Sequence, residues 1–599
     1  MLETTVPTTP TVRPPTVTWP VPGAPPPPGL ATLICPNCDS TAAKTYTLTI
    51  ELHAPDDTFK RLHVVRCTDC ACHFYDNQSP PDYAAPAMVN RGRLPFYVQQ
   101  GAGVSLITRP LAQLANPPGS MYMEVGCGYG FGLDFAINTR HWAGRGIDPA
   151  ALSALGRDAL NLPIELRYLR DDDEARGTMD LVMGSEVIEH VTSPRAFIRT
   201  LRAMLKPGGT LILTTPNGDD ITPDVPPGII VPLLSPSLHL VIQNASSLRW
   251  LLKEAGFIHV AVEVDSHSLV AFASERPLTL ERDPGKLRAI LRSHLQRRAE
   301  TIEPGTDLFF GFAGRAFQEA VNDAEMEAAD RAWDLLVPAC RIRFGLHIDT
   351  LSTLPSRLAT CDLEQMATLV PLNLGGILYA RAIRQLAAGL ARPRLERSFL
   401  LAAEAAASMR RALGELAMED GQTEDIEWTA RAEAALCAAA AGSPDAAQQV
   451  SALPAPPSGG SARLLALQQR AVGEWVNAGH YSPARAFVRR HGLDQAGFAQ
   501  PASTRNLTEL ERDTLFFLAV LDVQRDAAAE PAQARSRFAR VRATTPPGGG
   551  LWWAALNGEL QALDLLDAQV DAARVVRQVV TAHPDLTLPP AIAARIDQQ

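Results

Sequence analysis

The stretch MYMEVGCGYGFG, residues 121–132, is the feature that most limits how this chain can fold. A short apolar run is followed directly by four glycines at alternate positions, the last of them Gly132. Because glycine has no side chain, the backbone of such a loop can pass close to a ligand and present its N–H groups to it. The pattern predicts a strand, a ligand-binding loop and a helix, with a nucleotide-like ligand at the loop.

The spacing of these glycines and a later acid narrow the choice of ligand. A dinucleotide-binding loop has its third glycine three residues after the second, but that position is Phe131 here. The spacing therefore disfavours a nicotinamide or flavin enzyme. A second strand-like run, WAGRGIDPA, reaches Asp148, where a carboxylate can accept hydrogen bonds from both hydroxyls of a ribose.

At these residues the chain resembles the class I S-adenosylmethionine-dependent methyltransferases, and the resemblance extends to residue 257. Apolar and amphipathic runs alternate over 79–275, as a Rossmann-like α/β fold requires. The resemblance implies S-adenosylmethionine as cofactor, bound by Glu124, Gly126, Cys127, Gly128, Gly130, Asp148 and Glu186, with Asp171 or Asp172 at the adenine. The acidic run at 171–173 is equally well explained as a solvated group of charges.

The stretch SEVIEHV, residues 185–191, is the candidate for the chemistry. On a helical turn Glu186, Glu189 and His190 stand at i, i+3 and i+4, so their side chains can face one space beyond the sheet. His190 has an ordinary pKa of ~6.5, which suits a base that removes a proton from the methyl acceptor. His239 is a second candidate for a catalytic role.

The same stretch is similar to one in ubiquinone-pathway O-methyltransferases. That similarity implies that the two acids and the histidine lie at the active site, and it leaves open a divalent metal there. In many relatives this turn mainly braces the cofactor loop, and that alternative stays open as well. Phe96 and Tyr97 precede the first strand and could close over the cofactor. An apolar residue just before a domain more often packs beneath it, so we leave both out of the site.

Cysteines dominate the segment from residue 31 to 78. Cys35, Cys38, Cys67 and Cys70 form two C-x-x-C pairs on either side of a predicted hairpin with its turn at 54–57. Two such pairs can surround a structural zinc ion with four thiolates, and the segment resembles a zinc ribbon. Unliganded structural cysteines are the alternative. Cys72 and His73 are interpreted as bystanders, because a C-x-x-C pair reaches one metal more easily than C-x-C does.

The remaining chain divides by composition. Residues 1–30 are rich in proline, which predicts a disordered lead, and the zinc ribbon and methyltransferase domain follow at 31–78 and 79–275. Residues 276–599 are rich in alanine and predict an all-α domain that resembles degenerate tetratricopeptide repeats. A helical domain without repeats is the alternative. We expect this half to bind a protein partner or to position the substrate.

Charge and hydropathy limit the partners. The formal net charge of −10 argues against broad binding of nucleic acid, and the sequence predicts no membrane span and no signal peptide, hence a cytoplasmic protein. We expect methyl transfer to an oxygen of a small-molecule or saccharide acceptor. The alternatives are a non-catalytic binding protein built on the same fold and a zinc-ribbon enzyme that methylates ribosomal RNA.

Overall fold

The computed structural model describes residues 15–23, 25–53, 59–85, 91–416, 418, 420–499, 506–524 and 529–596. The predicted hairpin turn at 54–57 and residues 1–14 and 24 of the predicted lead lie outside these ranges. The chain divides into two compact units. The first comprises Met1–Leu351, Pro355–Ile377 and Ser408–Asp420, and the second comprises Ser352–Leu354, Leu378–Ala407 and Gly421–Gln599.

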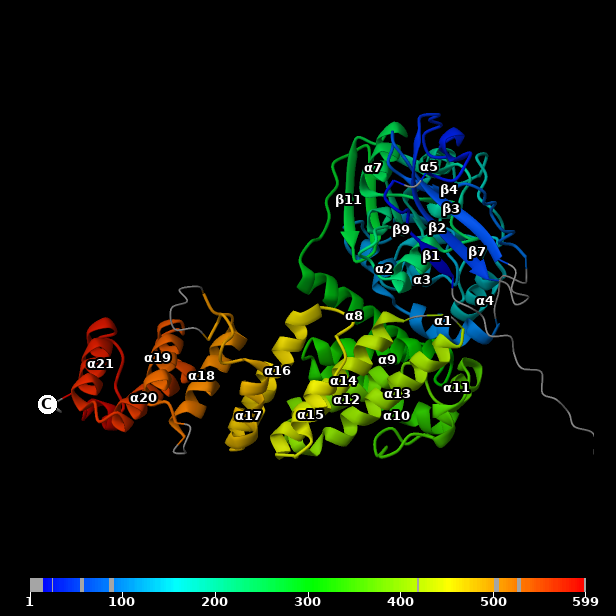
Figure 1. The fold of residues 1–599 in the computed structure, drawn as a ribbon. Coiled ribbons are helices and arrows are strands. Elements are labelled where there is room, and N and C mark those ends of the chain that lie inside the picture. The colour runs from blue at the N-terminus through cyan, green and yellow to red at the C-terminus, as the bar shows by residue number, and fades with distance from the viewer. Residues whose placement is uncertain are drawn as a thin grey trace, which may run out of the picture. The chain divides into compact units, whose positions relative to one another are not determined.

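A seven-stranded sheet forms the centre of the first unit, in the order β11-β12-β9-β8-β5-β6-β7 (Figure 1). Its strands are β5 (Met121–Val125), β6 (Ala143–Ile147), β7 (Ile164–Glu165), β8 (Met179–Ser185), β9 (Leu205–Pro216), β11 (His259–Asp265) and β12 (Ser268–Ser274). The strands from β9 to β7 run parallel, β12 is antiparallel to β9, and β11 is antiparallel to β12. The predicted Rossmann-like α/β fold is confirmed.

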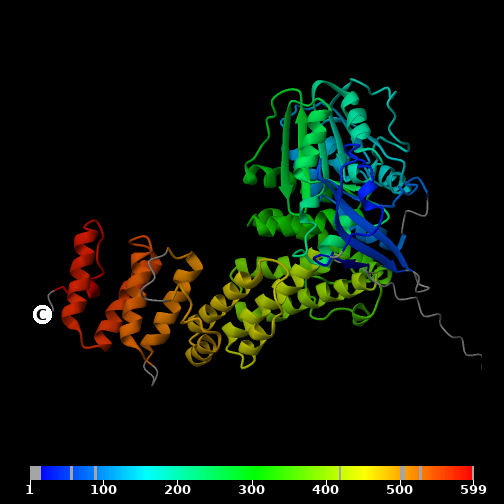
Figure 2. The same ribbon diagram turned by 45° about the horizontal axis from the view of Figure 1, so that its top comes forward.

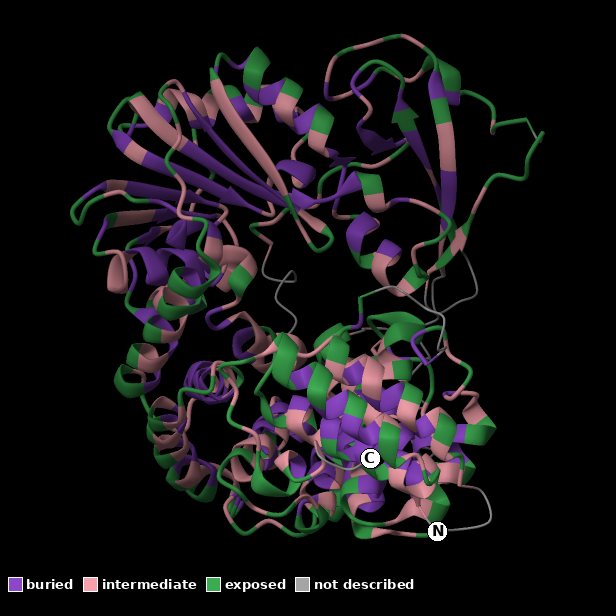
Figure 3. Ribbon diagram, turned by 90° about the vertical axis from the view of Figure 1, so that its left-hand side faces the viewer, coloured by how far each residue is buried: buried purple, intermediate pink, exposed green. Residues whose placement is uncertain are grey.

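Alternation along β5 shows how the sheet is covered. Met123 and Val125 belong to a core that also contains Leu201 of α5 (Pro194–Met204) and Leu251 of α7 (Ala245–Glu254). Glu124 points to the opposite face, toward α2 (Ser105–Ala112) and α3 (Phe131–Asn138). The inner strands β5, β8, β9 and β12 are accordingly buried along most of their length, whereas the edge strand β11 is only partly buried. Purple marks the buried stretches of the sheet in Figure 3. Helix α4 (Ala151–Leu160) connects β6 to β7.

A smaller antiparallel sheet lies in the same unit, in the order β1-β2-β3-β4-β10. Its strands are β1 (Thr16–Thr18), β2 (Lys44–His53), β3 (Phe59–Cys67), β4 (His73–Tyr75) and β10 (Val241–Ile242). On β2, the apolar residues Leu48 and Ile50 are buried. They share a core with α6 (Pro227–Leu234) and Ile242.

The small sheet therefore differs from the independent ribbon that the sequence predicts. One edge strand, β1, comes from the lead that was expected to be disordered, and pairs with β2. The other edge strand, β10, comes from the methyltransferase part of the chain and pairs with β4. A pairing of residue 242 with residue 73 depends on tertiary structure, so local sequence patterns carry no signal for it.

Helices beyond the sheet continue the first unit. They are α8 (Pro284–Thr301), α9 (Asp307–Asn322), α10 (Met326–Phe344) and α11 (Leu363–Leu369), and α8 and α9 pack against α2 and α1 (Leu94–Gly101), respectively (Figure 2). The contact is close: a β-carbon on Gly103 would lie 2.3 Å from Leu295 Cδ2. A boundary near residue 276 stays a prediction, and a fragment that ended there would expose the apolar surface that α8 and α9 cover.

The second unit is helical, which confirms the predicted all-α region. Its helices include α14 (Gly421–Ala441), α15 (Ala446–Ala452), α16 (Gly460–Asn477), α17 (Tyr481–His491), α18 (Glu509–Val523), α19 (Pro531–Ala543), α20 (Gly550–Leu565), α21 (Gln569–Ala582) and α22 (Pro590–Ala593), while α12 (Leu374–Ala387) and α13 (Glu396–Gly414) belong to both units. Helices α16, α18 and α20 pack in succession, each followed by a second helix (Figure 1). The tetratricopeptide-like character stays a prediction.

Single-turn 3-10 helices complete the described elements, at Leu30–Thr32, Arg91–Arg93, Ile188–His190, Gly218–Asp220, Ser356–Ala359 and Arg392–Arg394. Within the described ranges, no single helix has both the length and the apolar character to cross a membrane. The bent pair α11 and α12 meets these criteria together, by length and composition only.

Candidate active site

The glycines of the loop between β5 and α3 serve two different purposes. Gly126 has φ +70°, and a β-carbon there would lie 2.3 Å from Val187 Cγ2, in the turn after β8. Gly128 has φ +52°, and the nearest atom to its β-carbon position is Tyr97 Oη at 3.3 Å. The first glycine lets the loop pack against that turn, and the second keeps the surface above the loop free for a ligand.

Asp148, at the end of β6, holds this loop in place. Its Oδ2 accepts a hydrogen bond from the Gly128 amide at 2.8 Å, and its Oδ1 accepts one from the Ala150 amide at 2.7 Å. A carboxylate oxygen has two lone pairs, so each still has the capacity to accept a ribose hydroxyl. In the structure Asp148 thus fixes the backbone of the glycine loop, a role beyond the predicted binding of the ribose.

The side chains of Glu124 and Cys127 point to different surroundings. Glu124 is buried, and burial raises the pKa of its carboxyl group to about 8. Tyr122 Oη donates to Glu124 Oε2 at 3.1 Å. The Cys127 thiol points toward β6, since a β-carbon on Gly146 would lie 2.8 Å from its Sγ. Only the backbone of Cys127 is therefore available to a cofactor.

Tyr97 is a candidate that the sequence analysis left out. Its ring lies 6.3 Å from that of Phe131, between centroids, and its hydroxyl lies at Gly128. The residue is 42% exposed, so the core does not enclose its ring. An aromatic pair just before the first strand was the only signal for it, and that signal does not distinguish a ring over the loop from a ring packed beneath the domain.

The acidic run after β7 makes its own contacts at the surface. Asp172 is exposed and pairs with Arg170 at 2.8 Å, and Asp171 accepts a hydrogen bond from Thr200. The buried acid of the run is Asp173, which pairs with Arg167 at 2.6 Å. These pairings favour the solvated-charge interpretation, and an adenine contact from Asp171 or Asp172 stays a prediction.

The turn after β8 brings the predicted catalytic residues to the edge of the sheet. Glu186 has φ +53°, a conformation that costs a non-glycine residue about 1–3 kcal/mol. Two contacts to Thr214 hold it there: its amide donates to the carbonyl at 3.0 Å, and its Oε1 accepts from Oγ1 at 2.9 Å. Such strain is concentrated at functional sites.

Three side chains converge just beyond Glu186. Glu189 Oε1 lies 3.7 Å from His190 Nε2 and 4.0 Å from His239 Nε2. Glu189 is fully buried, and its Oε1 has no hydrogen-bond partner among the described residues. Its other oxygen, Oε2, accepts from Thr215 Oγ1 at 2.9 Å. The structure therefore brings together three of the four predicted catalytic residues.

The two imidazoles are oriented by backbone carbonyls. His239 Nδ1 lies 2.8 Å from the Leu233 carbonyl, and His190 Nδ1 lies 3.1 Å from the Leu238 carbonyl. Because a carbonyl can only accept, each Nδ1 carries the hydrogen, and each Nε2 keeps a lone pair that faces Glu189. Three acceptors thus meet at one point, which requires either a shared proton or a cation.

Tyr83 supports His190 from the segment between the two sheets. Its hydroxyl lies 2.7 Å from His190 Nδ1 and donates to the Leu238 carbonyl at 3.2 Å. Burial raises the pKa of this phenol, and the charge of Glu189 adds to the shift. Nothing in the sequence around residue 83 signals this contact, which joins positions 107 residues apart.

Burial sets the protonation of the cluster. It raises the pKa of Glu186 to about 7 and that of Glu189 well above its ordinary value, and the charge of Glu186 raises the latter further. Burial also lowers the pKa of His190, and it lowers that of His239 to about 3. A neutral imidazole beside a buried acid can accept a proton from a reacting group and later release it, as general acid–base catalysis requires.

The cysteines of the small sheet also converge. Ligand atoms of Cys35, Cys38, Cys67 and Cys70 all lie within 4.8 Å of one another, with Sγ distances of 3.7 Å for the pairs 35–70 and 38–67. Four sulfurs at ~2.3 Å from a zinc ion stand about 3.8 Å apart, so the cluster has the right dimensions. Cys72 Sγ also lies close, 3.6 Å from Cys35 Sγ.

The two knuckles have the same backbone form and contact the large sheet's domain. Each places a left-handed residue after its second cysteine, Asp39 with φ +59° and Ala71 with φ +66°. Asn244, the N-cap of α7, donates to the Ala71 carbonyl at 3.0 Å. Gln243 Nε2 donates to Asn37 Oδ1 at 2.9 Å. The residues just after β10 therefore hold both knuckles.

Comparison with known proteins agrees with the fold and the loop. Residues 100–262 match the family model described as a methyltransferase domain. The ubiquinone biosynthesis O-methyltransferase of Caulobacter vibrioides is 32% identical over 173 residues, which cover 27% of this chain and 66% of that protein. The enzyme of the same name from Pseudomonas syringae pv. tomato is 34% identical over 110 residues, or 17% of this chain and 47% of that protein.

The chain spans less than two thirds of the length of either relative. Among solved structures, an S-adenosylmethionine-dependent methyltransferase from Aquifex aeolicus is 18% identical, with 30% of this chain and 97% of that one covered and a TM-score of 0.24. An O-methyltransferase family protein from Burkholderia thailandensis is 17% identical, with 31% and 56% covered and a TM-score of 0.24. The sheet order, the glycine loop and the family match define a class I S-adenosylmethionine-dependent methyltransferase domain in this chain.

Proposed function

We propose that this chain transfers a methyl group from S-adenosylmethionine to an oxygen of a small-molecule acceptor. The observation that carries the proposal is the cluster of Glu189, His190 and His239, in which the buried Oε1 of Glu189 has no hydrogen-bond partner among the described residues and lies near both imidazoles. The cluster follows the turn in which Val187 packs on Gly126. It is therefore adjacent to the loop where the cofactor would bind.

The reaction needs little from the protein beyond position and a base. The acceptor oxygen attacks the methyl carbon, a C–O bond forms as the C–S bond breaks, and the sulfonium becomes a neutral thioether. The hydroxyl proton passes to His190 Nε2, because burial lowers the pKa of His190 and keeps its imidazole neutral. Tyr83 and the Leu238 carbonyl fix the ring of His190 by its other nitrogen, so Nε2 stays directed at the acceptor side.

The same three residues fit a divalent cation. A carboxylate oxygen and two imidazole nitrogens suit first-row metals, and carbonyls bound to both Nδ1 atoms are the usual support for metal-binding histidines. Such a cation would polarise the acceptor oxygen and lower its pKa. Glu189, His190 and His239 would hold it, whereas Glu186 is directed to Thr214 instead.

We also propose zinc at the four-cysteine cluster, in a structural role. Four thiolates would close its coordination and leave no position for a substrate. Through Asn37 and Ala71 the knuckles hold the residues after β10, and β10 follows His239 directly. The zinc site would thus keep one wall of the acceptor cleft in place.

For the acceptor, the helical second unit and the location of the protein we keep the following expectations. No observation favours a saccharide over other hydroxyl-bearing acceptors. For the helices of the second unit we keep the expectation that they bind a protein or position the acceptor. A cytoplasmic location also stays an expectation.

The test is identification of the product. The protein is incubated with S-adenosylmethionine carrying a labelled methyl group and with a panel of phenols, sugars, nucleotide sugars and hydroxy acids, and products are analysed by mass spectrometry. Label on an oxygen of a small acceptor would support the proposal. Label on ribosomal RNA, or tight cofactor binding without transfer to any acceptor in the panel or in a metabolite extract, would contradict it.

A further inference from the structure

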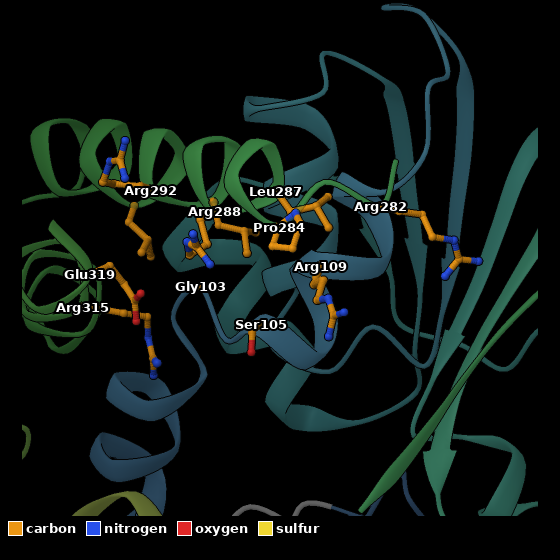
Figure 4. Close-up of a pocket in the computed structure, with 12 residues that line it drawn as sticks. Gly103, Ser105, Arg109, Arg282, Pro284, Leu287, Arg288, Arg292, Arg315 and Glu319 are labelled. Atoms are coloured by element: carbon orange, nitrogen blue, oxygen red, sulfur yellow. The ribbon is translucent and has the colours of Figure 1, made fainter. Parts of the chain in front are cut away.

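A cavity in the first unit lies away from the glycine loop. Its volume is about 350 Å³, and it is lined by Gly103, Ser105, Arg109, Arg282, Pro284, Leu287, Arg288, Leu291, Arg292, Leu295, Arg315 and Glu319 (Figure 4). These residues come from the start of α2, from α8 with the loop before it, and from α9. Five of the twelve are arginines, against one acid.

Most of these arginines form ion pairs with acids that do not line the cavity. Arg109 pairs with Asp265 at 2.8 Å, and Arg288 pairs with Asp323 at 3.2 Å. Neither of these acids lines the cavity. A guanidinium has five N–H donors, and one carboxylate leaves several of them unused. The ion pairs thus fix the arginines while donors remain for a ligand.

Arg315 differs from the other arginines, because its guanidinium group donates its hydrogen bonds to neutral backbone carbonyls. Its Nε donates to the Ala102 carbonyl at 3.1 Å and its Nη2 to the Gln100 carbonyl at 2.8 Å. Among the described residues, no carboxylate oxygen lies within 4.0 Å of its guanidinium. Burial lowers its pKa, and the charges of Glu319 and Asp420 oppose that shift, as expected of a cation held away from water.

Leucine side chains of α8 line the cavity beside these charges. Leu287 and Leu295 of α8 are almost fully buried, and Leu291 lies one turn from each. From the guanidinium donors, the buried cation of Arg315 and these leucines, we propose that the cavity binds a small organic anion with a phosphate or carboxylate head and an apolar body. This site is separate from the methyl-transfer cleft, since no residue of the glycine loop lines it.

Binding of three probes to the full-length protein tests the proposal. Phenyl phosphate and benzoate supply the two head groups on the same ring, and benzyl alcohol is the neutral counterpart. Titrations are followed by ligand-observed NMR with the protein saturated with S-adenosylhomocysteine. We expect saturable binding of at least one anion in the millimolar range, no binding of the alcohol, and no competition with S-adenosylhomocysteine.

Two variants locate the site without disturbing Arg315, which caps the end of α1. Arg288→Ala and Arg109→Ala should each weaken binding of the preferred anion about five- to tenfold, as partly exposed charge-assisted bonds allow. Arg297→Ala, an exposed residue of α8 outside the cavity, is the matched control and should bind as the native protein does. Absence of saturable anion binding, equal affinity in all variants, displacement by S-adenosylhomocysteine or equal binding of benzyl alcohol would each overturn the proposal.

Discussion

The Asp148 carboxylate accepts a hydrogen bond from the backbone amide of Gly128 at 2.8 Å. An acid that was expected to hold only the ribose of the cofactor therefore also fixes the loop that would hold its amino-acid part. One side chain would therefore contribute to cofactor binding in two ways, through the ribose and through the loop. Removing the side chain removes both contributions.

Asp148→Ala should consequently weaken cofactor binding more than the loss of ribose contacts alone. Charge-assisted hydrogen bonds contribute roughly 1.5–3 kcal/mol, or about one to two decades of affinity, and a loosened loop adds to that. Calorimetric titration with S-adenosylhomocysteine measures the change. Asp158→Ala, an exposed residue of α4, is the control and should bind like the native protein; equal affinity for Asp148→Ala would show that the cofactor does not reach this acid.

The contact between Gly126 and Val187 gives a second prediction. Gly126→Ala should lower the free energy of unfolding by about 1–3 kcal/mol from backbone strain alone, with a further cost from the clash at 2.3 Å. Gly177→Ala is a matched control, because Gly177 has the same φ of +70° and no atom within 4 Å of its β-carbon position. Urea unfolding of both variants should show the larger loss for Gly126→Ala.

A double variant separates the clash from the strain. Val187→Ala removes Cγ2, so the combination of Gly126→Ala with Val187→Ala should be more stable than the sum of the two single changes predicts. Simple additivity would mean that these two residues do not press on each other in solution.

Much of this arrangement could be predicted from the sequence, and the reasons are local. The glycine loop, the acid at the end of the second strand and the two C-x-x-C pairs are short patterns whose chemistry depends on neighbours in the chain. The turn at 185–191 could be predicted for the same reason. The contacts of this turn with His239, Tyr83 and β10 could not be predicted from the sequence. These residues meet only after β10 has paired with β4.

The position of Tyr97 differs from the one expected, for a related reason. An aromatic ring before a domain packs beneath it or covers its ligand, depending on the direction in which the first helix leaves the sheet. Contacts of α1 with α9 set that direction, and they connect segments some two hundred residues apart, as the bond from Gln99 Nε2 to Asp307 shows. Tyr97 thus reaches the loop at Gly128.

The cysteine cluster gives a prediction with an internal control. The protein should contain one zinc ion per chain, and Cys38→Ser should lose it because Cys38 belongs to the four-thiolate set. Cys72→Ser should keep the metal, although Cys72 Sγ lies 3.5 Å from Cys70 Sγ, since only the two C-x-x-C knuckles present their sulfurs as a set. Elemental analysis decides; loss of zinc in Cys72→Ser with retention in Cys38→Ser would reverse the assignment.

His294 predicts a specific pH dependence of stability. It is buried in α8, with Nδ1 2.8 Å from Thr139 Oγ1, and burial followed by the charge of Arg298 lowers its pKa to about 3. The unfolded chain takes up a proton near pH ~6.5 that the folded protein does not, so this contribution is complete above that pH and declines below it, by at most about 1.4 kcal/mol per pH unit.

Comparison with His294→Gln isolates that contribution. Both proteins keep Asp134 and Arg298, which face His294, and burial raises the pKa of Asp134 to about 6. The advantage of the native protein over the variant should shrink as the pH falls from about 6.5 to about 4.5, in urea-unfolding curves. The exposed His347 is the control position, and a constant difference between native protein and His294→Gln would contradict the prediction.

The central claim is that Glu189, with His190 and His239, serves methyl transfer and not cofactor binding. The direct measurement is the rate of labelled methyl transfer to the acceptor that the panel identifies, in native protein and in Glu189→Gln, beside the affinity of each for S-adenosylhomocysteine. The amide keeps the size of the side chain and removes the carboxyl group, with its capacity to exchange a proton or to hold a cation. Glu174→Gln, at an exposed acid paired with Arg145, is the matched control. We predict a rate about a hundredfold lower or more for Glu189→Gln, with unchanged cofactor affinity and a control like the native protein; a native rate in Glu189→Gln, or a loss of rate that follows a loss of cofactor binding, would contradict the claim.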